Sequence, residues 1–171
     1  MSKLNESRSF IPVGIAVLTV SDTRTPADDK SGDTLVARIA EAGHRLVARA
    51  ICRDDKQAIF EQVKAWTLGD DIDVVITTGG TGFTGRDVTP EALDQIKDKD
   101  IPGFGELFRW LSYQTIGTST IQSRGMAVLA RGKYIFALPG SNGAVKDGWT
   151  SSSRGIDSRL VKFDIATGPA V

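Results

Sequence analysis

The sequence predicts an α/β fold built around a mostly parallel β-sheet. Three apolar runs in the first half have the length and composition of buried strands, and stretches of helical periodicity separate them. This β-α-β-α-β order implies right-handed crossovers between parallel strands. In the second half, two apolar runs joined by a short turn predict a small β-hairpin. Because 171 residues is the size of one domain, we expect a single domain over residues 1–171.

The first half of the chain supplies the alternating elements. They are a strand over residues 13–20 (VGIAVLTV), a helix over 31–43, a strand over 46–52, a helix that ends at residues 69–71, and a strand over 73–78. The first strand is almost entirely apolar and is expected to be buried on both faces. Gly43 stands where a glycine commonly ends a helix. In the second helix, Ile59, Val63 and Trp66 recur on one face.

The second half has a less regular pattern. Thr89 is expected to be an N-cap with Pro90 at the first helical position, and this helix is expected to run to about Lys97. The segment Ile101-Pro-Gly103 is then expected to interrupt the helical pattern. The remaining predicted elements are a helix over residues 105–113, hairpin strands over 126–130 (MAVLA) and 134–138 (YIFAL), and a helix that contains Trp149.

Composition excludes several classes of protein. The 21 Lys and Arg residues balance the 21 Asp and Glu residues, and no basic cluster indicates nucleic-acid binding. The apolar runs are too short to span a membrane, and residues 1–10, which we expect to be flexible, lack the features of a signal peptide. A single cysteine, Cys52, and a single histidine, His44, leave no intramolecular disulfide and no Cys/His zinc site. We therefore expect a cytoplasmic protein.

Glycines are concentrated after the third strand. The segment Gly79-Gly-Thr-Gly-Phe-Thr-Gly85 contains the G-x-G-x-x-G pattern of dinucleotide-binding proteins, but it follows the third strand rather than the first. A nicotinamide oxidoreductase is therefore disfavoured. Unhindered backbone N–H groups beside the Thr78 and Thr81 hydroxyls favour an anion-binding loop over simple tight turns. A second loop, Pro139–Gly143, also follows a strand, and we expect both loops to flank one crevice.

Three aspartates lie near these loops. Asp22 follows the first strand, Asp55 precedes a helix, and Asp87 follows the glycine loop. Each has a structural alternative, which is an Asx-turn for Asp22, a helix N-cap for Asp55 and bonds to its own turn for Asp87. Magnesium in phosphate chemistry is held by one or two carboxylates together with phosphate oxygens. On the residues alone, capping is favoured for Asp55, and both interpretations stay open for the other two.

Several motifs, in this order along the chain, resemble the molybdopterin-binding family of molybdenum cofactor biosynthesis. They are Thr19-Val-Ser-Asp22, Thr77-Thr-Gly-Gly-Thr-Gly82, Arg86-Asp-Val-Thr-Pro-Glu-Ala92 and Leu138-Pro-Gly140. Residues 102–109 and 116–124 resemble its MoaB branch in particular. The resemblance covers residues 10–149, whereas residues 151–171 depart from the family pattern. It implies a three-layer α/β/α fold and a homo-oligomer, either a trimer or a hexamer.

The resemblance also implies a function. In active relatives, the terminal phosphate of molybdopterin attacks the α-phosphate of Mg-ATP and gives adenylyl-molybdopterin and pyrophosphate. Asp55 and Asp87 match positions implicated in catalysis and magnesium binding, and their retention favours an enzyme. The alternative is a non-catalytic molybdopterin-binding or carrier oligomer, and other enzymes of the pathway are possible partners. The residues implied in substrate and nucleotide binding are Ser21, Asp22, Thr78, Gly79, Gly80, Thr81, Gly82, Pro139, Gly140 and Ser141.

Overall fold

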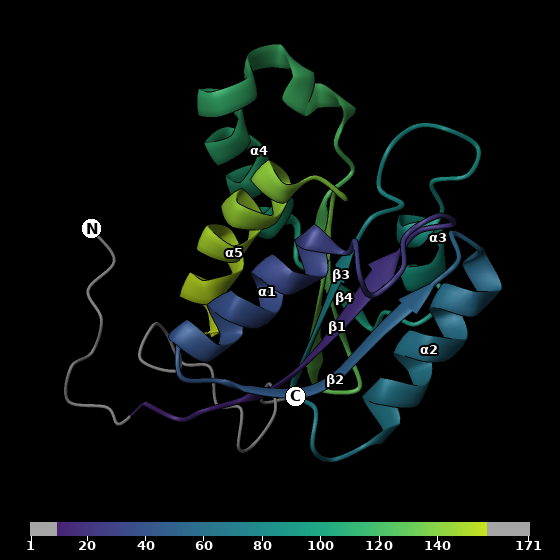
Figure 1. Ribbon diagram of the computed structural model, residues 1–171, viewed down its shortest axis with the longest axis vertical. Coiled ribbons are helices and arrows are strands. Elements are labelled where there is room, and N and C mark those ends of the chain that lie inside the picture. The colour runs from purple at the N-terminus through teal and green to yellow at the C-terminus, as the bar shows by residue number, and fades with distance from the viewer. Residues whose placement is uncertain (1–9, 157–171) are drawn as a thin grey trace.

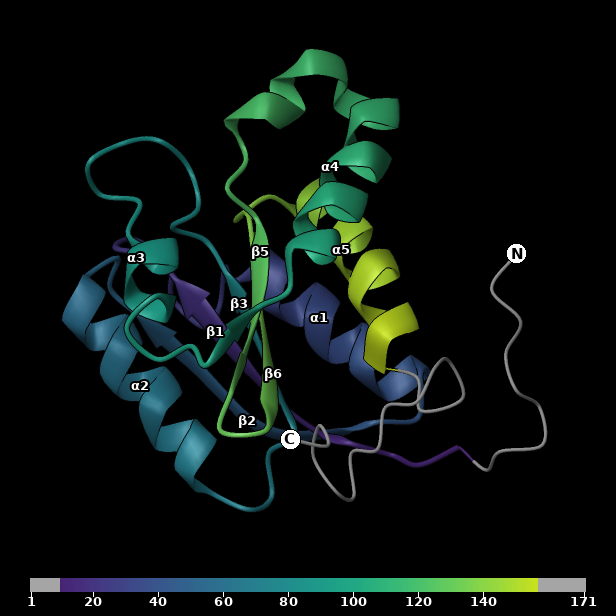
Figure 2. The same cartoon turned by 180° about the vertical axis from the view of Figure 1, so that it is seen from behind.

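Helices cover both faces of a six-stranded sheet, which confirms the expected three-layer α/β/α fold (Figures 1 and 2). The computed structural model describes residues 10–156, with side chains up to residue 151. Residues 1–9 of the expected flexible N-terminus and residues 157–171 of the divergent tail lie outside the described part. The strands are β1 (Gly14–Val20), β2 (Arg45–Cys52), β3 (Val74–Thr78), β4 (Lys99–Asp100), β5 (Met126–Ala130) and β6 (Lys133–Leu138). The helices are α1 (Lys30–Glu41), α2 (Lys56–Leu68), α3 (Thr89–Leu93), α4 (Pro102–Ile116), the 3₁₀ helix η1 (Gly117–Gln122) and α5 (Asn142–Ile156).

The sheet has the strand order β2-β1-β3-β6-β5-β4. Strands β2, β1, β3 and β6 run parallel, and β5 is antiparallel to both of its neighbours. The chain passes from β1 to β2 on one side and then returns to β3 on the other side of β1. A topological switch point therefore lies between β1 and β3, where the loops after the two strands diverge and leave a crevice at the carboxyl edge.

The core is divided between the two faces of the sheet. One apolar cluster joins alternate residues of β1 and β3, such as Ile15 and Ile76, to α1, α4 and α5. A second cluster joins the intervening residues, such as Leu18 and Val75, to α2 and α3. Every residue of β1 and β3 is buried, as expected for strands that helices cover on both faces.

The predicted hairpin is confirmed as β5 and β6. Ala130 pairs with Lys133, and the two residues between them have positive φ, 52° at Arg131 and 75° at Gly132. Two consecutive positive φ angles are typical of the type I′ turn, whose twist matches that of the two strands it joins. The hairpin places β5 as the antiparallel neighbour of β6, and β4 pairs with its outer side.

The limits predicted for the helix after the glycine loop are wrong at both ends. Val88 is the N-cap, and the Thr89 hydroxyl donates a hydrogen bond to the Gly79 carbonyl at 2.9 Å instead of capping the helix. The helix ends at Leu93 and not at Lys97. Shortly after it, the chain pairs with β5 as the two-residue strand β4, which sequence periodicity does not reveal.

The expected interruption at Ile101-Pro-Gly103 is also wrong. Pro102 is the first residue of α4, where the absence of an N–H costs no hydrogen bond and the fixed φ suits a helix. The helix continues beyond the predicted 105–113 to Ile116, and Gly117, at φ 58°, ends it. The longer α4 and the following η1 extend past the carboxyl edge of the sheet (Figure 1).

Candidate functional site

The two glycine loops meet at the carboxyl edge of the sheet. The Gly79 N–H donates a hydrogen bond to the Leu138 carbonyl at 2.9 Å, and the Thr78 hydroxyl donates one to the Pro139 carbonyl at 3.1 Å. A Cβ on Gly140 would lie 3.4 Å from the Gly79 Cα. The loops after β3 and β6 therefore pack directly against each other, and the structure brings together the two segments that the sequence placed beside one crevice.

The backbone conformation and the close packing at positions 79 and 80 require glycine. Their φ angles are 110° and 66°, in a region that residues with a Cβ rarely adopt. A Cβ on Gly79 would lie 2.1 Å from the Val20 carbonyl oxygen, and one on Gly80 would lie 2.4 Å from the Thr89 hydroxyl. These two glycines let the loop turn tightly between β1 and α3, which holds the next residues, Thr81 and Gly82, at the edge of a pocket.

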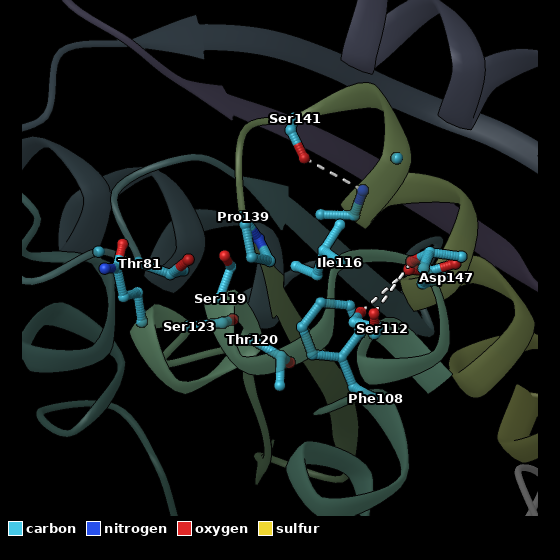
Figure 3. Close-up of a pocket in the computed structure, with 15 residues that line it drawn as sticks. Thr81, Phe108, Ser112, Ile116, Ser119, Thr120, Ser123, Pro139, Ser141 and Asp147 are labelled. Carbon is cyan, nitrogen blue, oxygen red and sulfur yellow. Dashed lines mark hydrogen bonds between the residues drawn. The ribbon is translucent and has the colours of Figure 1, made fainter. Parts of the chain in front are cut away.

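The pocket has a volume of about 220 Å³ and lies between the glycine loops, α4, η1 and α5 (Figure 3). Four of the predicted binding residues line it, namely Thr81, Gly82, Pro139 and Ser141. The far wall was not predicted, and it includes Phe108, Ser112 and Ile116 of α4, Ser119 and Thr120 of η1, Ser123 after η1, and Asp147 of α5. The other predicted binding residues, Ser21, Asp22, Thr78, Gly79, Gly80 and Gly140, are not among the residues that line it.

Polar groups at the loop side of the pocket favour an anion. The Thr81 hydroxyl is buried, and no described group forms a hydrogen bond with it, although buried hydroxyls are normally paired. The Ser141 hydroxyl accepts a hydrogen bond from the Ala144 N–H at 3.1 Å, in the first turn of α5. Helix α5 thus begins at the pocket, and the positive end of its dipole favours negative charge there.

Carboxylates gather on the other side of the glycine loop. The Asp54 Oδ1 atom accepts a hydrogen bond from the Val88 N–H at 3.3 Å and would be 2.8 Å from a Cβ on Gly80. Burial and the charges of Asp87 and Asp22 raise the pKa of Asp54, although the Val88 hydrogen bond opposes this shift. Three acidic side chains therefore interact beside the loop.

Asp87 is held by its own turn, as one sequence interpretation expected. Its Oδ2 atom accepts hydrogen bonds from the Thr84 N–H at 2.9 Å and the Thr84 hydroxyl at 2.5 Å. Burial acts to raise the pKa of Asp87, but these bonds, the Gly82 amide and the charge of Arg124 outweigh it, so the pKa lies below its ordinary value. Asp87 is therefore ionised at neutral pH.

Asp55 is the N-cap of α2, and its Oδ1 atom accepts a hydrogen bond from the Ala58 N–H at 2.8 Å. Its neighbour Asp54 lies against the glycine loop instead, so sequence reasoning missed a residue of this site. One signal for Asp54 was available: an aspartate that caps a helix is directed toward the first turn, and the residue before it remains available to a neighbouring loop.

Arginine side chains also contact the glycine loops. The zero net charge of the chain does not reveal these contacts. The Arg124 Nε atom donates a hydrogen bond to the Gly82 carbonyl at 2.8 Å, and its Nη2 atom donates one to the Asp87 carbonyl at 2.6 Å. Arg86 forms an ion pair with Asp22. Arg24 Nη2 donates a hydrogen bond to the Gly140 carbonyl at 2.8 Å. These side chains brace the loop backbones and bring positive charge close to the carboxylates.

The described residues contain no group of three or more acidic, His or Cys side chains that could hold a metal ion by themselves. Their oxygen donors are nevertheless of the type that magnesium prefers. Burial and, to a smaller extent, the charges of Asp87 and Asp22 raise the pKa of Asp54, and a cation next to Asp54 and Asp87 would offset the repulsion between these charges. The carboxylates present thus fit a magnesium ion that takes its remaining ligands from phosphate oxygens and water.

A pocket at the carboxyl edge of a mostly parallel sheet, bordered by glycine loops and a helix N-terminus, is the arrangement in which α/β proteins commonly bind phosphate-bearing ligands. Residues 16–155 match the family described as "Probable molybdopterin binding domain". The chain belongs to this family, and the resemblance found in its motifs is confirmed. None of the described helices is long and apolar enough to cross a membrane.

Similar proteins come from several organisms. Molybdenum cofactor biosynthesis protein B of Escherichia coli K12 is 50% identical over 143 residues, which are 84% of each chain. The protein of that name from Staphylococcus carnosus is 52% identical over 134 residues, 77% of this chain and 78% of the relative. A crystal structure of molybdenum cofactor biosynthesis protein B is 42% identical, with a TM-score of 0.82 over 87% of this chain and 95% of the other. The tungsten cofactor synthesizing protein MoaB from Pyrococcus furiosus is 37% identical, with a TM-score of 0.71 over 85% and 94%.

Proposed function

We propose that this protein acts in molybdenum cofactor biosynthesis, binds molybdopterin in the pocket of Figure 3, and adenylylates it with Mg-ATP. Family membership and the names of its relatives support the pathway and the pterin ligand. The observation that supports adenylylation is that Asp54 and Asp87 lie against Gly80 and Gly82, in a glycine loop that also borders the pocket.

The chemistry needs no covalent intermediate on the protein. An oxygen of the molybdopterin phosphate attacks the α-phosphorus of ATP, a new P–O bond forms, and the bond to the β-phosphate breaks to release pyrophosphate. Phosphoryl chemistry of this kind depends mainly on positioning and charge stabilisation. The Thr81 hydroxyl and the N-terminus of α5 would hold phosphate oxygens. Magnesium, when bound, neutralises phosphate charge, and Asp87 with Asp54 or Asp55 would hold it.

The direct test incubates the protein with molybdopterin and Mg-ATP and detects adenylyl-molybdopterin by mass spectrometry. Product that requires both ATP and magnesium is the expected result. No product, under conditions in which a known adenylyltransferase works, would contradict the catalytic proposal. The alternative function, a non-catalytic molybdopterin carrier, would then be supported by binding of molybdopterin that does not depend on ATP. The capping role of Asp55 is the observation that favours this alternative, because it gives that carboxylate a purely structural use.

The unpaired Thr81 hydroxyl gives a prediction for ligand binding. Thr81→Val keeps the shape of the side chain, so the free energy of unfolding should be unchanged or rise by up to about 1 kcal/mol, because an unsatisfied polar group is removed. Affinity for molybdopterin should fall by about fivefold to tenfold through loss of one hydrogen bond. Thermal unfolding and calorimetry measure the two effects.

Thr77→Val is a matched control for this experiment. The Thr77 hydroxyl is also buried and has no hydrogen-bond partner among the described residues, but it lies within β3 and does not line the pocket. This variant should show the same stability effect as Thr81→Val with unchanged affinity. Equal affinities for molybdopterin in both variants and the parent protein would show that Thr81 does not contact the ligand.

We also propose that the protein is a homo-oligomer, a trimer or a hexamer. An exposed apolar surface supports this, since Trp110, Tyr113 and Ile116 of α4 and Ile121 of η1 are each more than half exposed. Large exposed apolar patches commonly mark interaction sites. Light scattering should show a trimer or hexamer, and Trp110→Glu should shift it toward monomer if this surface is the interface. A monomeric parent protein at high concentration would contradict the proposal.

A further inference from the structure

The wall of the pocket formed by α4 and α5 contains an unexpected charge. Among the described residues that line the pocket, only Asp147 has an ionisable side chain. A carboxylate in a pocket that accepts a phosphate is unfavourable unless it serves another part of the ligand, because like charges repel. A ligand group that donates hydrogen bonds would make a carboxylate at this position favourable.

One oxygen of the Asp147 side chain is fixed by a hydrogen bond, and the other has no donor among the described residues. Its Oδ2 atom accepts a hydrogen bond from the Ser112 hydroxyl at 3.0 Å, across from α5 to α4 (Figure 3). Ser112 itself is buried, so this contact anchors the carboxylate firmly. No described group donates a hydrogen bond to Oδ1, and no described Lys or Arg forms an ion pair with Asp147.

The surroundings of Asp147 suit a flat heterocycle. Phe108 and Ile116 of α4 form apolar walls beside it, and Pro139 lies across the pocket (Figure 3). Asp147 follows Ser141 by six residues, so along the helix axis it lies about 9 Å from the N-terminal end of α5. That distance separates a carboxylate at one end of the pocket from the anion-binding groups at the other, and leaves space for a fused ring system between them.

We propose that the Asp147 carboxylate recognises the 2-amino-4-oxopyrimidine edge of the pterin. This inference rests on the proposed binding of molybdopterin. That edge presents two adjacent donors, the ring N3–H and the exocyclic 2-amino group, and two carboxylate oxygens accept both in parallel. Adenine offers no such pair, because its amino group lies next to a ring nitrogen that accepts. Asp147 thus selects the pterin, and Ser112 positions the Asp147 carboxylate through its hydrogen bond. The phosphate of the ligand then lies toward Thr81 and Ser141.

The proposal predicts a change of specificity. Asn at position 147 presents one acceptor and one donor, which complements the N3–H and the 2-carbonyl of a 2,4-dioxopteridine. The same amide places its donor against the 2-amino group of a pterin, which leaves both groups unpaired. Asp147→Asn should therefore reverse the preference between the two rings, an outcome that a merely structural role for Asp147 would not produce.

The experiment measures affinity for two probes by calorimetry. One is a 6-substituted pterin that carries a phosphate monoester, and the other is its counterpart with a 2-carbonyl in place of the 2-amino group. The parent protein should prefer the pterin. Asp147→Asn should bind the pterin about 10- to 100-fold more weakly and prefer the 2-carbonyl probe. Ser112→Ala should weaken pterin binding by about fivefold. Asp70→Asn, an exposed aspartate at the opposite edge of the sheet, should change neither affinity.

Several outcomes would overturn the assignment of Asp147. One is unchanged affinity and preference in Asp147→Asn. Another, which needs no variant, is equal binding of the two probes by the parent protein. Binding of the pterin with either of these results would leave the proposed function intact. Failure of the parent protein to bind the pterin probe at all would overturn both the assignment and the proposed function.

Discussion

Asp87→Asn is expected to lower the rate of adenylyl transfer by about 100-fold or more, with fold and assembly preserved. The reason is electrostatic: Asp87 would hold the magnesium ion that neutralises phosphate charge, and loss of one group on which such charge stabilisation depends commonly has an effect of this size. The Asn oxygen can still accept a hydrogen bond from the Thr84 N–H, so the loop should keep its conformation. The rate of product formation by mass spectrometry measures the loss, and light scattering and circular dichroism check assembly and fold.

Variants of Asp55 and Asp54 test the same proposed magnesium site. We expect Asp55→Asn to abolish turnover in the same way, on the strength of the position that it shares with the family. Asp54→Asn, by contrast, tests stability, and it should raise the free energy of unfolding at neutral pH. A carboxyl whose pKa is raised on folding destabilises the folded state once it ionises, and the amide removes that charge. Normal turnover in both Asp55→Asn and Asp87→Asn would show that the proposed magnesium ligands are wrong.

Asp29→Ala is expected to lower the free energy of unfolding by about 3 kcal/mol, near the lower limit for breaking a buried charge pair. The Asp29 side chain is completely buried and accepts hydrogen bonds from Arg49 Nη2 at 2.8 Å, the Thr19 hydroxyl at 2.8 Å and the Gly32 N–H at 3.0 Å. Its loss leaves the buried hydroxyl and amide unpaired. Chemical denaturation measures the change.

Asp33→Ala provides the control for this prediction. Asp33 pairs with the same arginine at 2.7 Å, but its side chain is 60% exposed. Exposed ion pairs contribute little, so the free energy of unfolding should fall by about 0.5 kcal/mol or less. Equal losses in the two variants would contradict the view that burial sets the strength of the Asp29 network.

The Asp29 prediction includes a dependence on pH. Burial acts to raise the pKa of Asp29, but the hydrogen bonds from Arg49, Gly32 and Thr19 outweigh it, so the folded pKa lies below the ordinary value of 3.8. The ionised carboxylate therefore stabilises the folded state fully above that ordinary value, and the stabilisation is lost as pH falls through the folded pKa. The difference in unfolding free energy between the parent protein and Asp29→Ala should thus shrink in strong acid.

Much of the fold follows from local patterns in the sequence. The apolar runs of β1 and β3 and the periodicity of α1 and α2 identify these elements, because each pattern reflects burial on two faces or on one. The glycines before α3, such as Gly79 and Gly80, indicate a backbone with positive φ. Local patterns failed where pairing decides the structure: α3 stops at Leu93 because the chain soon joins β5, and no periodicity in a two-residue strand signals that.

The sequence by itself determined the α/β class, the family, and the two glycine loops, because these depend on residue type and order along the chain. The position of Asp55 just before a helix predicts that it caps α2, but only the tertiary structure decided that Asp54 contacts the glycine loop, since that contact depends on how α2 is placed beside the sheet. It also decided that α4 and α5 bring Ser112 and Asp147 together across 35 positions of sequence. The zero net charge of the chain gave no sign of these contacts, because a balanced total does not reveal where charges meet.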